Sequence, residues 1–292
     1  MSAVRRCPGC LHEATRSAGT VGGYDLVHCR RCATLLTVRL PSSAAEATDY
    51  EGANEVSLEV PAFVERRLGE IVGTFERQRR LNRWLDVGCG AGALLRAASS
   101  LGWEAVGTEV SPSAVEAIRA TGLEVHLGRL DDVGLEPGGF DVVSLVEVVE
   151  HLADPEQTLR DAARLVRPGG TLYLTTPHGR GLSARLLGTG WSVVAPPEHL
   201  QLFSVAGLRA LLRRCGLPRA RVRTHALNPH ELRAGILRRR PSSSGARKET
   251  GRQLNESLTS TRLGTIGKDA VNVGLNVLRL GDTLKVTAER PA

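Results

Sequence analysis

A run of alternate glycines near residue 85 is the part of this sequence best suited to holding a ligand. The segment reads Leu-Asp-Val-Gly-Cys-Gly-Ala-Gly over residues 85–92. Glycine lets the backbone turn tightly and approach a bound group where a Cβ would clash. A helical pattern starts directly after Gly92, so the turn would place a nucleotide-type ligand at a helix N-terminus. Glycine-rich turns also occur as plain connectors, and the neighbouring residues must decide.

The spacing of this run disfavours other nucleotide-binding loops. It reads Asp-x-Gly-x-Gly-x-Gly from Asp86, whereas enzymes that bind NAD or FAD carry Gly-x-Gly-x-x-Gly. No Gly-Lys-Ser/Thr follows, which excludes a phosphate-binding P-loop. A second acidic residue, Glu109, ends the next expected strand, over residues 103–108. A carboxylate at that tip is placed to accept hydrogen bonds from a ribose diol.

Four cysteines near the N-terminus have the spacing of a metal site. Cys7, Cys10, Cys29 and Cys32 form the pattern Cys-x2-Cys-x18-Cys-x2-Cys. Each Cys-x2-Cys forms a tight knuckle, and four thiolates complete the shell of one tetrahedral ion, so we predict a structural zinc. Disulfides are disfavoured in an intracellular chain. A redox site would need one Cys-x-x-Cys beside a strand–helix–strand unit rather than two in tandem.

Short apolar segments alternate with helical patterns around these residues. Helices are expected to start at Ser111-Pro112 and Asp154-Pro155, because serine and aspartate cap a helix and proline suits its first position. The turn Arg-Pro-Gly-Gly at residues 167–170 is expected to end the second of these helices. The predicted strands cover residues 84–87, 103–108, 123–127, 140–149, 172–176, 221–226 and 283–288.

The order of these motifs resembles that of class I S-adenosylmethionine-dependent methyltransferases of the ubiquinone-type or small-molecule subgroup. The glycine run, Glu109, the Phe-Asp-Val-Val strand from Phe140 and the Arg-Pro-Gly-Gly turn follow one another between residues 60 and 225. The resemblance implies an α/β fold with a Rossmann-like, seven-stranded methyltransferase sheet and helices on both faces. It also implies S-adenosylmethionine as the cofactor. The residues that it places at the cofactor are Asp86, Gly88, Gly90, Gly92, Glu109, Leu130, Asp131 and Glu147.

Three polar residues lie at the end of the fourth expected strand: Glu147, Glu150 and His151. If a helical turn starts at Glu147, the i, i+3 and i+4 spacing places their side chains on one face. The cluster resembles the metal-binding motif of ubiquinone-pathway and small-RNA 2′-O-methyltransferases, in which a divalent ion orients and acidifies substrate hydroxyls. Alternatively, Glu147 contacts the cofactor, while Glu150 and His151 form a local hydrogen-bonded pair. His151 is also a candidate catalytic residue.

The segment Pro-Pro-Glu-His-Leu-Gln-Leu-Phe-Ser at residues 196–204 follows the fifth expected strand. Its pattern is typical of a large methyltransferase subgroup, and we expect it to border the acceptor pocket. His199 is the first candidate for a general base, or for the final ligand of a metal held by Glu147, Glu150 and His151. Its alternative role is to brace the loop by bonding the backbone. His178 is a second histidine candidate, and Ser204 is expected to cap the next helix.

The motifs divide the chain into three parts. Residues 1–40 are expected to form the zinc ribbon, residues 41–59 a linker, and residues 60–292 the methyltransferase domain. The domain is expected to begin with an amphipathic helix over residues 61–80. Between its last two strands we predict an insertion at about residues 227–282, partly disordered and suited to a lid or substrate-recognition role.

The charge of the chain is unevenly distributed. Its formal net charge is +7 at pH 7, yet the middle of the chain is acidic and the basic residues gather at the two ends. A basic end suits nucleic acid or an anionic substrate, although solvated surface arginines give the same pattern. No apolar run approaches the length of a membrane-spanning helix, and the N-terminus lacks a hydrophobic leader. The sequence therefore predicts a cytoplasmic protein.

These observations predict an S-adenosylmethionine-dependent methyltransferase that acts on a small molecule, by O- or C-methylation of a sugar or secondary metabolite. The alternative is an RNA-modifying methyltransferase that uses the zinc ribbon and the basic tail to hold its substrate. The acidic middle and the aromatic content of only 3% argue against RNA, because RNA readers often stack bases on aromatic side chains. A non-catalytic binding protein is disfavoured by the intact glycine run.

Overall fold

A computed structural model describes residues 5–41, 60–227, 229–236 and 272–291 of the chain. The expected linker falls almost wholly outside the described residues, as does most of the expected insertion. Two compact units are present. The first comprises Met1–Leu40, Thr176–Leu208 and Val222–Lys285, and the second Pro41–Thr175, Arg209–Arg221 and Val286–Ala292. The domain boundaries expected from the sequence stay predictions.

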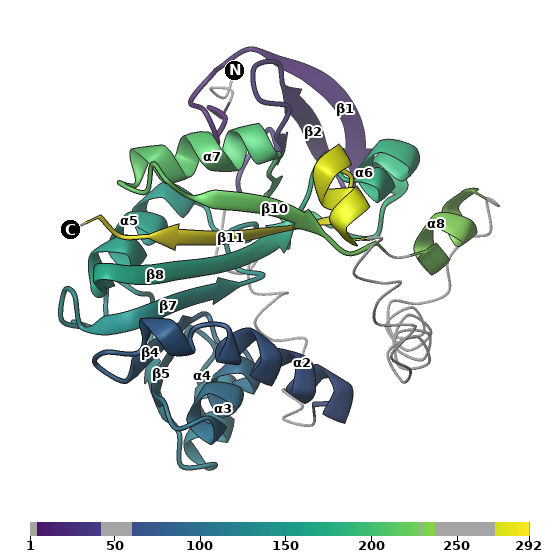
Figure 1. Ribbon diagram of the computed structural model, residues 1–292. Helices are drawn as coiled ribbons and strands as arrows, with labels where there is room; N and C mark the ends of the chain where they lie inside the picture. The colour runs from purple at the N-terminus through teal and green to yellow at the C-terminus, as the bar shows by residue number, and fades with distance from the viewer. Residues whose placement is uncertain (1–4, 42–59, 228, 237–271, 292) are drawn as a thin grey trace. The chain divides into compact units, whose positions relative to one another are not determined.

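A seven-stranded mixed sheet confirms the predicted α/β fold. Its strand order is β10-β11-β8-β7-β4-β5-β6, and β7, β8 and β11 lie side by side in Figure 1. The pairs β4–β5, β4–β7, β5–β6 and β7–β8 are parallel. The strands are β4 (Arg83–Val87), β5 (Glu104–Glu109), β6 (Glu124–Leu127), β7 (Phe140–Val146), β8 (Val166–Pro177), β10 (Arg221–His225) and β11 (Thr283–Glu289).

The central strands of this sheet are buried because their sequences are almost continuously apolar. In β7 all residues but the last are buried, as expected for a parallel strand covered on both faces. Next to it in the sheet, Trp84 of β4 is fully buried and packs edge-on against Phe75 and Trp103. Such aromatic contacts add to the area that the rings bury, and they fix the strand beneath the glycine run.

Three helices of the second unit begin where the sequence predicts: α3 (Ala93–Ser100) directly after the glycine run, and α4 (Pro112–Arg119) and α5 (Pro155–Leu165) after their capping residues. The Ser111 hydroxyl accepts a hydrogen bond from the Ala114 amide at the start of α4. The Asp154 carboxylate accepts bonds from Glu156 and Gln157 at the start of α5. Both caps satisfy amides that have no partner inside the helix.

Two of the sequence motifs are joined by a buried ion pair. The Arg167 Nε donates to Asp141 Oδ1 at 2.6 Å, which links the Arg-Pro-Gly-Gly turn to the Phe-Asp-Val-Val strand. The Asp141 carboxylate also accepts bonds from the backbone amides of Arg80, Leu81 and Arg83. A fully buried carboxylate needs this many donors because its desolvation is otherwise costly. The pair therefore locks the edge from which β4 and β7 start.

Three expected boundaries are wrong. The helix expected over residues 61–80 is α2 (Ala62–Gly73), followed by the 3-10 turn η1 (Glu76–Gln78), because the chain bends to bury Phe75 in the core. The fourth strand ends at Val146 rather than at residue 149, since Glu147 has a φ of +56° and cannot continue it. The fifth strand already starts at Val166, where residues after α5 pair with β7.

The first unit is built on a second, four-stranded sheet of order β1-β2-β3-β9. Its strands are β1 (Thr15–Val21), β2 (Tyr24–Cys29), β3 (Leu35–Thr37) and β9 (Gln201–Leu202). Strands β1 and β2, both labelled in Figure 1, pair antiparallel and lead into the second knuckle. The described helical segments of this unit include α6 (Leu182–Leu187), η2 (Gly188–Gly190), α8 (Pro229–Ile236) and residues 272–278.

The helix α7 (Val205–Arg214) begins in the first unit, directly after β9. Its first turn is capped by Ser204, as expected from the sequence, because the Ser204 Oγ accepts a bond from the Gly207 amide at 2.9 Å. None of the helices in the described ranges combines the length and the apolar character that a membrane crossing requires.

Candidate functional site

The glycine run forms a left-handed turn between β4 and α3. Gly88, Gly90 and Gly92 have φ angles of +63°, +52° and +72°, a region that residues with a Cβ rarely adopt. A Cβ on Gly88 would lie 3.0 Å from Val148 Cγ2, and one on Gly92 would lie 3.2 Å from Ile118 Cγ1. A Cβ on Gly90 would meet nothing within 4 Å. The middle of the turn therefore faces open space that a ligand can fill.

The start of α3 offers donors to such a ligand. Gly92 occupies the capping position and has no side chain to bond the first amides of the helix. These amides point out of the helix end, and the helix dipole favours negative charge there. A ligand carboxylate or phosphate is thus matched to this end of the turn.

The Glu109 carboxylate joins the turn to the tip of β5. Its Oε2 accepts a bond from the Gly90 amide at 2.8 Å. Its Oε1 accepts bonds from the amides of Val110 at 2.8 Å and Ser111 at 3.0 Å. A carboxylate has about four acceptor positions, so these three bonds hold it in place and leave capacity for a hydroxyl group. Its location and chemistry fit the predicted ribose contact.

Asp86 lies inside the sheet, below the turn. It is 3% exposed, and its Oδ1 accepts a 2.6 Å bond from the hydroxyl of Ser144 on β7. Burial raises the pKa of Asp86 to about 7, the Ser144 bond opposes this rise, and the Glu109 charge adds to it. Ser144 also accepts a bond from Trp84 Nε1 at 2.9 Å. Sequence reasoning missed Ser144, although a small polar residue inside an apolar strand was the signal.

Two further residues near Glu109 were missed. Val110 follows β5 and Leu127 ends β6, and the two apolar side chains are 44% and 49% exposed. Leu127 is the register partner of Glu109. Of the two cofactor residues predicted after β6, Leu130 is buried, whereas Asp131 is exposed and forms a 3.9 Å ion pair with Arg129. Exposed apolar side chains here are suited to a flat base.

The polar cluster after β7 forms a turn rather than a helix. Glu147, at φ +56°, accepts a 2.8 Å bond from the Thr175 hydroxyl through its Oε1. Glu150 is fully buried, and its Oε1 lies 3.8 Å from the Nε2 of His151. The structure therefore brings the side chains of Glu150 and His151 close together. Glu147 is held by β8 instead.

The two histidine candidates in the first unit have different surroundings. The Nδ1 of His199 is 2.6 Å from the carbonyl oxygen of Val193. A carbonyl only accepts, so the neutral ring carries its proton on Nδ1 and a lone pair on Nε2. His178 is 1% exposed, bonds the carbonyl of Gly281 through Nδ1, and has its pKa lowered to about 4 by burial. His178 therefore braces the chain as a neutral ring.

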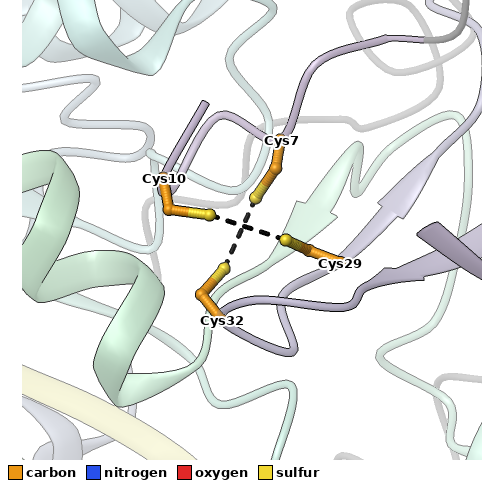
Figure 2. A group of neighbouring side chains, drawn as sticks. All are labelled: Cys7, Cys10, Cys29 and Cys32. Atoms are coloured by element: carbon orange, nitrogen blue, oxygen red, sulfur yellow. Dashed lines mark hydrogen bonds between the residues drawn. The ribbon is translucent and has the colours of Figure 1, made fainter. Parts of the chain in front are cut away.

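The four predicted cysteines converge on one point (Figure 2). The sulfur atoms of Cys7 and Cys32 are 3.5 Å apart, as are those of Cys10 and Cys29, and all four lie within 4.8 Å of one another. Four sulfurs around a tetrahedral zinc at 2.3 Å would be separated by about 3.8 Å. All four are free thiols. The cluster has the chemistry and the spacing to hold one metal ion.

The surroundings of the cysteines are apolar. Cys7, Cys29 and Cys32 are buried against Val27 and Leu36. The pKa of Cys32 is held at about 5 chiefly by its hydrogen bond with Cys7, and burial raises the pKa of Cys10 to about 11. Burial makes it costly for several of these sulfurs to carry a negative charge without a cation. A cation that replaces the thiol protons would satisfy all four at once.

The sheet order, the glycine turn and the acidic tip of β5 together define a nucleotide-type site of the class I methyltransferase kind. A family model described as a methyltransferase domain matches residues 60–218. This match covers more than half of the chain, and the chain belongs to this family of S-adenosylmethionine-dependent methyltransferases.

Two similar curated relatives are ubiquinone biosynthesis O-methyltransferases. The one from Xanthomonas campestris pv. campestris is 39% identical over 101 residues, which are 32% of this chain and 42% of the relative. The one from Xanthomonas euvesicatoria pv. vesicatoria is 32% identical over 148 residues, which are 46% of this chain and 62% of the relative. The chain thus spans less than two thirds of the length of these relatives.

Solved structures support the fold. A SAM-dependent methyltransferase from Archaeoglobus fulgidus aligns over 82% of this chain and 97% of its own, with a TM-score of 0.54 and 16% identity. Phosphoethanolamine N-methyltransferase 2 from Haemonchus contortus, in complex with S-adenosyl-L-methionine, aligns over 84% of this chain and 56% of its own. Its TM-score is 0.54 and its identity 18%. At these identities the likeness concerns the fold alone.

Proposed function

We propose that this methyltransferase acts on a small molecule, by O- or C-methylation of a sugar or secondary metabolite. Binding of the methyl donor is supported chiefly by the open space at Gly90, which the Glu109 carboxylate borders. The small-molecule acceptor is supported by relatives named for ubiquinone biosynthesis. The predicted cytoplasmic location stays a prediction.

The proposed cofactor contacts follow from the chemistry of each position. When bound, S-adenosylmethionine supplies the methyl group and a sulfonium leaving group. The uncapped start of α3 receives its carboxylate, and Glu109 accepts bonds from its ribose hydroxyls. Beneath the turn, Asp86 and Ser144 hold the backbone in place. The full proposed set is Asp86, Gly88, Gly90, Gly92, Glu109, Leu130, Asp131 and Glu147.

An oxygen acceptor must also lose a proton. We propose His199 for this role, because its Nδ1 bond to Val193 leaves the basic lone pair on Nε2. His151 is the second candidate. Its Nε2 lies 3.8 Å from Glu150 Oε1, which is too long for the hydrogen bond of a local pair, and a divalent ion at Glu147, Glu150 and His151 is the alternative.

For the cysteine cluster we propose a structural zinc. Thiolate ligands favour zinc, and four of them fill a tetrahedral shell, so no position remains for a substrate. The ribbon formed by residues 1–40 would then depend on the ion for its fold, because so short a segment has little core of its own.

One observation favours the alternative acceptor, RNA. Arg16 and His28 are register partners on β1 and β2, and the pKa of His28 is lowered by burial and then by the positive charges of Arg180 and Arg16. This electropositive part of the first unit would suit a phosphate backbone. Binding of RNA that weakens steeply with salt would support this alternative.

The proposed function is tested with the methyl donor carrying a tritium label and with cell extract separated into small-molecule and RNA fractions. We expect label in the small-molecule fraction. The His199→Ala variant should keep the cofactor dissociation constant of the parent and lose about 10²- to 10⁴-fold in turnover. The matched control is His12→Ala, another histidine of the first unit. Turnover equal to that of the parent would exclude His199 as the base, and label in RNA alone would overturn the small-molecule proposal.

A further inference from the structure

The segment that carries His199 is part of the cysteine ribbon's sheet. We call residues 193–204 the histidine loop. Its residues Gln201 and Leu202 form β9, which pairs antiparallel with β3 in the register Leu35–Leu202 and Leu36–Gln201. The Thr37 amide extends this pairing by donating to the carbonyl of Leu200 at 3.0 Å. The backbone directly after His199 is therefore held by ribbon residues.

Apolar packing holds the other end of the histidine loop. Val194 and Leu202 pack with Leu26 and Leu35 of the ribbon, and the neighbouring Trp191 completes this buried cluster. A buried indole contributes a large apolar area, so this contact stabilises the loop as well as the ribbon. The only regular structure within the described histidine loop is the two-residue β9, which exists through its pairing with the ribbon.

Ser204 links the loop to the cysteine cluster itself. Its hydroxyl donates to the carbonyl of Cys32 and accepts from the Gly207 amide at the start of α7. A cap that serves only its helix would bond the helix amides alone. Ser204 therefore fixes the end of the histidine loop to the second cysteine knuckle.

The first turn of α7 lies directly against both knuckles. A Cβ on Gly207 would come too close to Thr34 Oγ1 and would lie 3.2 Å from Cys32 Sγ. A Cβ on Gly9, inside the first knuckle, would lie 2.9 Å from the Cα of Gly207. Neither glycine has a positive φ, so the reason for glycine here is space alone. The packing at this point leaves no room even for a methyl group.

We propose that the metal-loaded cysteine cluster is the clamp that fixes the histidine loop, with Ser204 as the positioning residue between them. Metal occupancy would then control turnover but not cofactor affinity, since the proposed cofactor residues belong to the other compact unit. The link to turnover rests on the proposed role of His199, whereas the clamp itself is a structural claim that is measured separately.

The clamp is tested on the full chain by hydrogen–deuterium exchange, with and without removal of the metal by a chelator. We expect removal to speed exchange in peptides covering residues 193–204 by tenfold or more, as for a local opening that has become about 1.4 kcal/mol easier. Peptides covering residues 83–92 should keep their exchange rates, and the cofactor dissociation constant should stay within twofold. Unchanged exchange in residues 193–204 would overturn the proposal.

Two variants test the clamp without a chelator. Gly207→Ala should push α7 away from Cys32, speed exchange in the histidine loop and lower turnover about tenfold at an unchanged cofactor KM. Its matched control is Gly69→Ala in α2, where a Cβ meets nothing within 4 Å and an added methyl should be neutral or stabilising. If Gly207→Ala keeps the exchange rates of the parent, the clamp is refuted.

Ser204→Ala should speed exchange in the histidine loop and lower turnover as Gly207→Ala does, while the chain still retains its metal. Ser204→Thr keeps the hydroxyl and should therefore show the slow exchange of the parent. Equal effects of Ala and Thr would exclude the hydroxyl as the link. The outcomes also separate the two proposals. Faster loop exchange with full turnover supports the clamp and contradicts the role of His199. Slow exchange contradicts the clamp whatever the turnover, and the role of His199 is then decided by His199→Ala alone.

Discussion

The glycine turn and the histidine loop are held in place by contacts of very different range. The bond that fixes the turn joins Gly90 to Glu109, which are 19 residues apart in the chain. The bond that fixes the end of the histidine loop joins Ser204 to Cys32, which are 172 residues apart. The bond that fixes the glycine turn is therefore local in sequence, whereas the predicted acceptor side depends on contacts between two distant segments of the first unit.

The two regions also differ in what stabilises them. Left-handed glycines and a buried Asp86 shape the turn, and an apolar sheet supports it from below. The ribbon has a small apolar cluster and four converging thiols, so its stability is expected to come from a bound ion. A disturbance of the metal should thus be confined to the first unit. A disturbance of the turn should weaken cofactor binding.

The largest effect is expected from Cys29→Ser. Loss of one thiolate opens the tetrahedral shell, so metal content should fall from one ion per chain to near zero, as measured by atomic emission. Because ion binding drives the folding of such ribbons, the first unit should lose about 5 kcal/mol or more in free energy of unfolding. The control is Cys215→Ala in the second unit, which should keep its metal. A metal-loaded Cys29→Ser chain would show that the ribbon does not need all four sulfurs.

A smaller effect, in the second unit, concerns the pH dependence of stability. Burial raises the pKa of Asp86 from 3.8 to about 7, so the folded chain keeps a proton that the unfolded chain releases. The folded state is therefore favoured by this group at low pH, and that contribution is lost as pH rises from about 4 to about 7. Asp86→Asn cannot titrate and should keep the Ser144 bond. As the pH rises from 4 to 8, the free energy of unfolding of Asp86→Asn should increase by up to about 4 kcal/mol relative to that of the parent.

The measurement for Asp86 is the free energy of unfolding in urea across this pH range. Asp131→Asn is the control, because Asp131 is exposed and a charge already in water has little to gain from neutralisation. If the free energy of unfolding depends on pH in the same way for Asp86→Asn and the parent, then Asp86 does not keep its proton in the folded state.

The contrast in contact range also explains what the sequence could predict. The glycine turn, Glu109 and the caps Ser111 and Asp154 are read from neighbouring residues, and each was found in its expected element. The cysteine cluster was predictable despite its span, because two Cys-x2-Cys pairs leave few alternatives. Local chemistry thus fixed the type of each element and the metal-site residues.

What the sequence could not predict are the contacts that join distant segments. Nothing near Gln201 indicates that it forms a strand, since its partner Leu36 belongs to a distant segment of the chain. Gly207 likewise reads as an ordinary helix residue until Cys32 is placed against it. The premature end of β7 at Val146 depends on the left-handed conformation of Glu147, which its residue type disfavours.

The last and smallest of these effects tests the cofactor side alone. A Cβ on Gly90 would meet no atom of the protein, so Gly90→Val adds bulk only where the methyl donor is proposed to lie. We expect the dissociation constant of S-adenosylmethionine from this variant, measured by calorimetry, to rise about a hundredfold. That rise corresponds to roughly 3 kcal/mol of binding free energy. Part of any change would reflect the left-handed φ of +52°, so the control is Gly122→Val, at φ +82° and also in open space. That variant carries a similar backbone penalty and should bind as the parent does. If both variants bind equally, the space at Gly90 is not the cofactor site, and the turn is a plain connector.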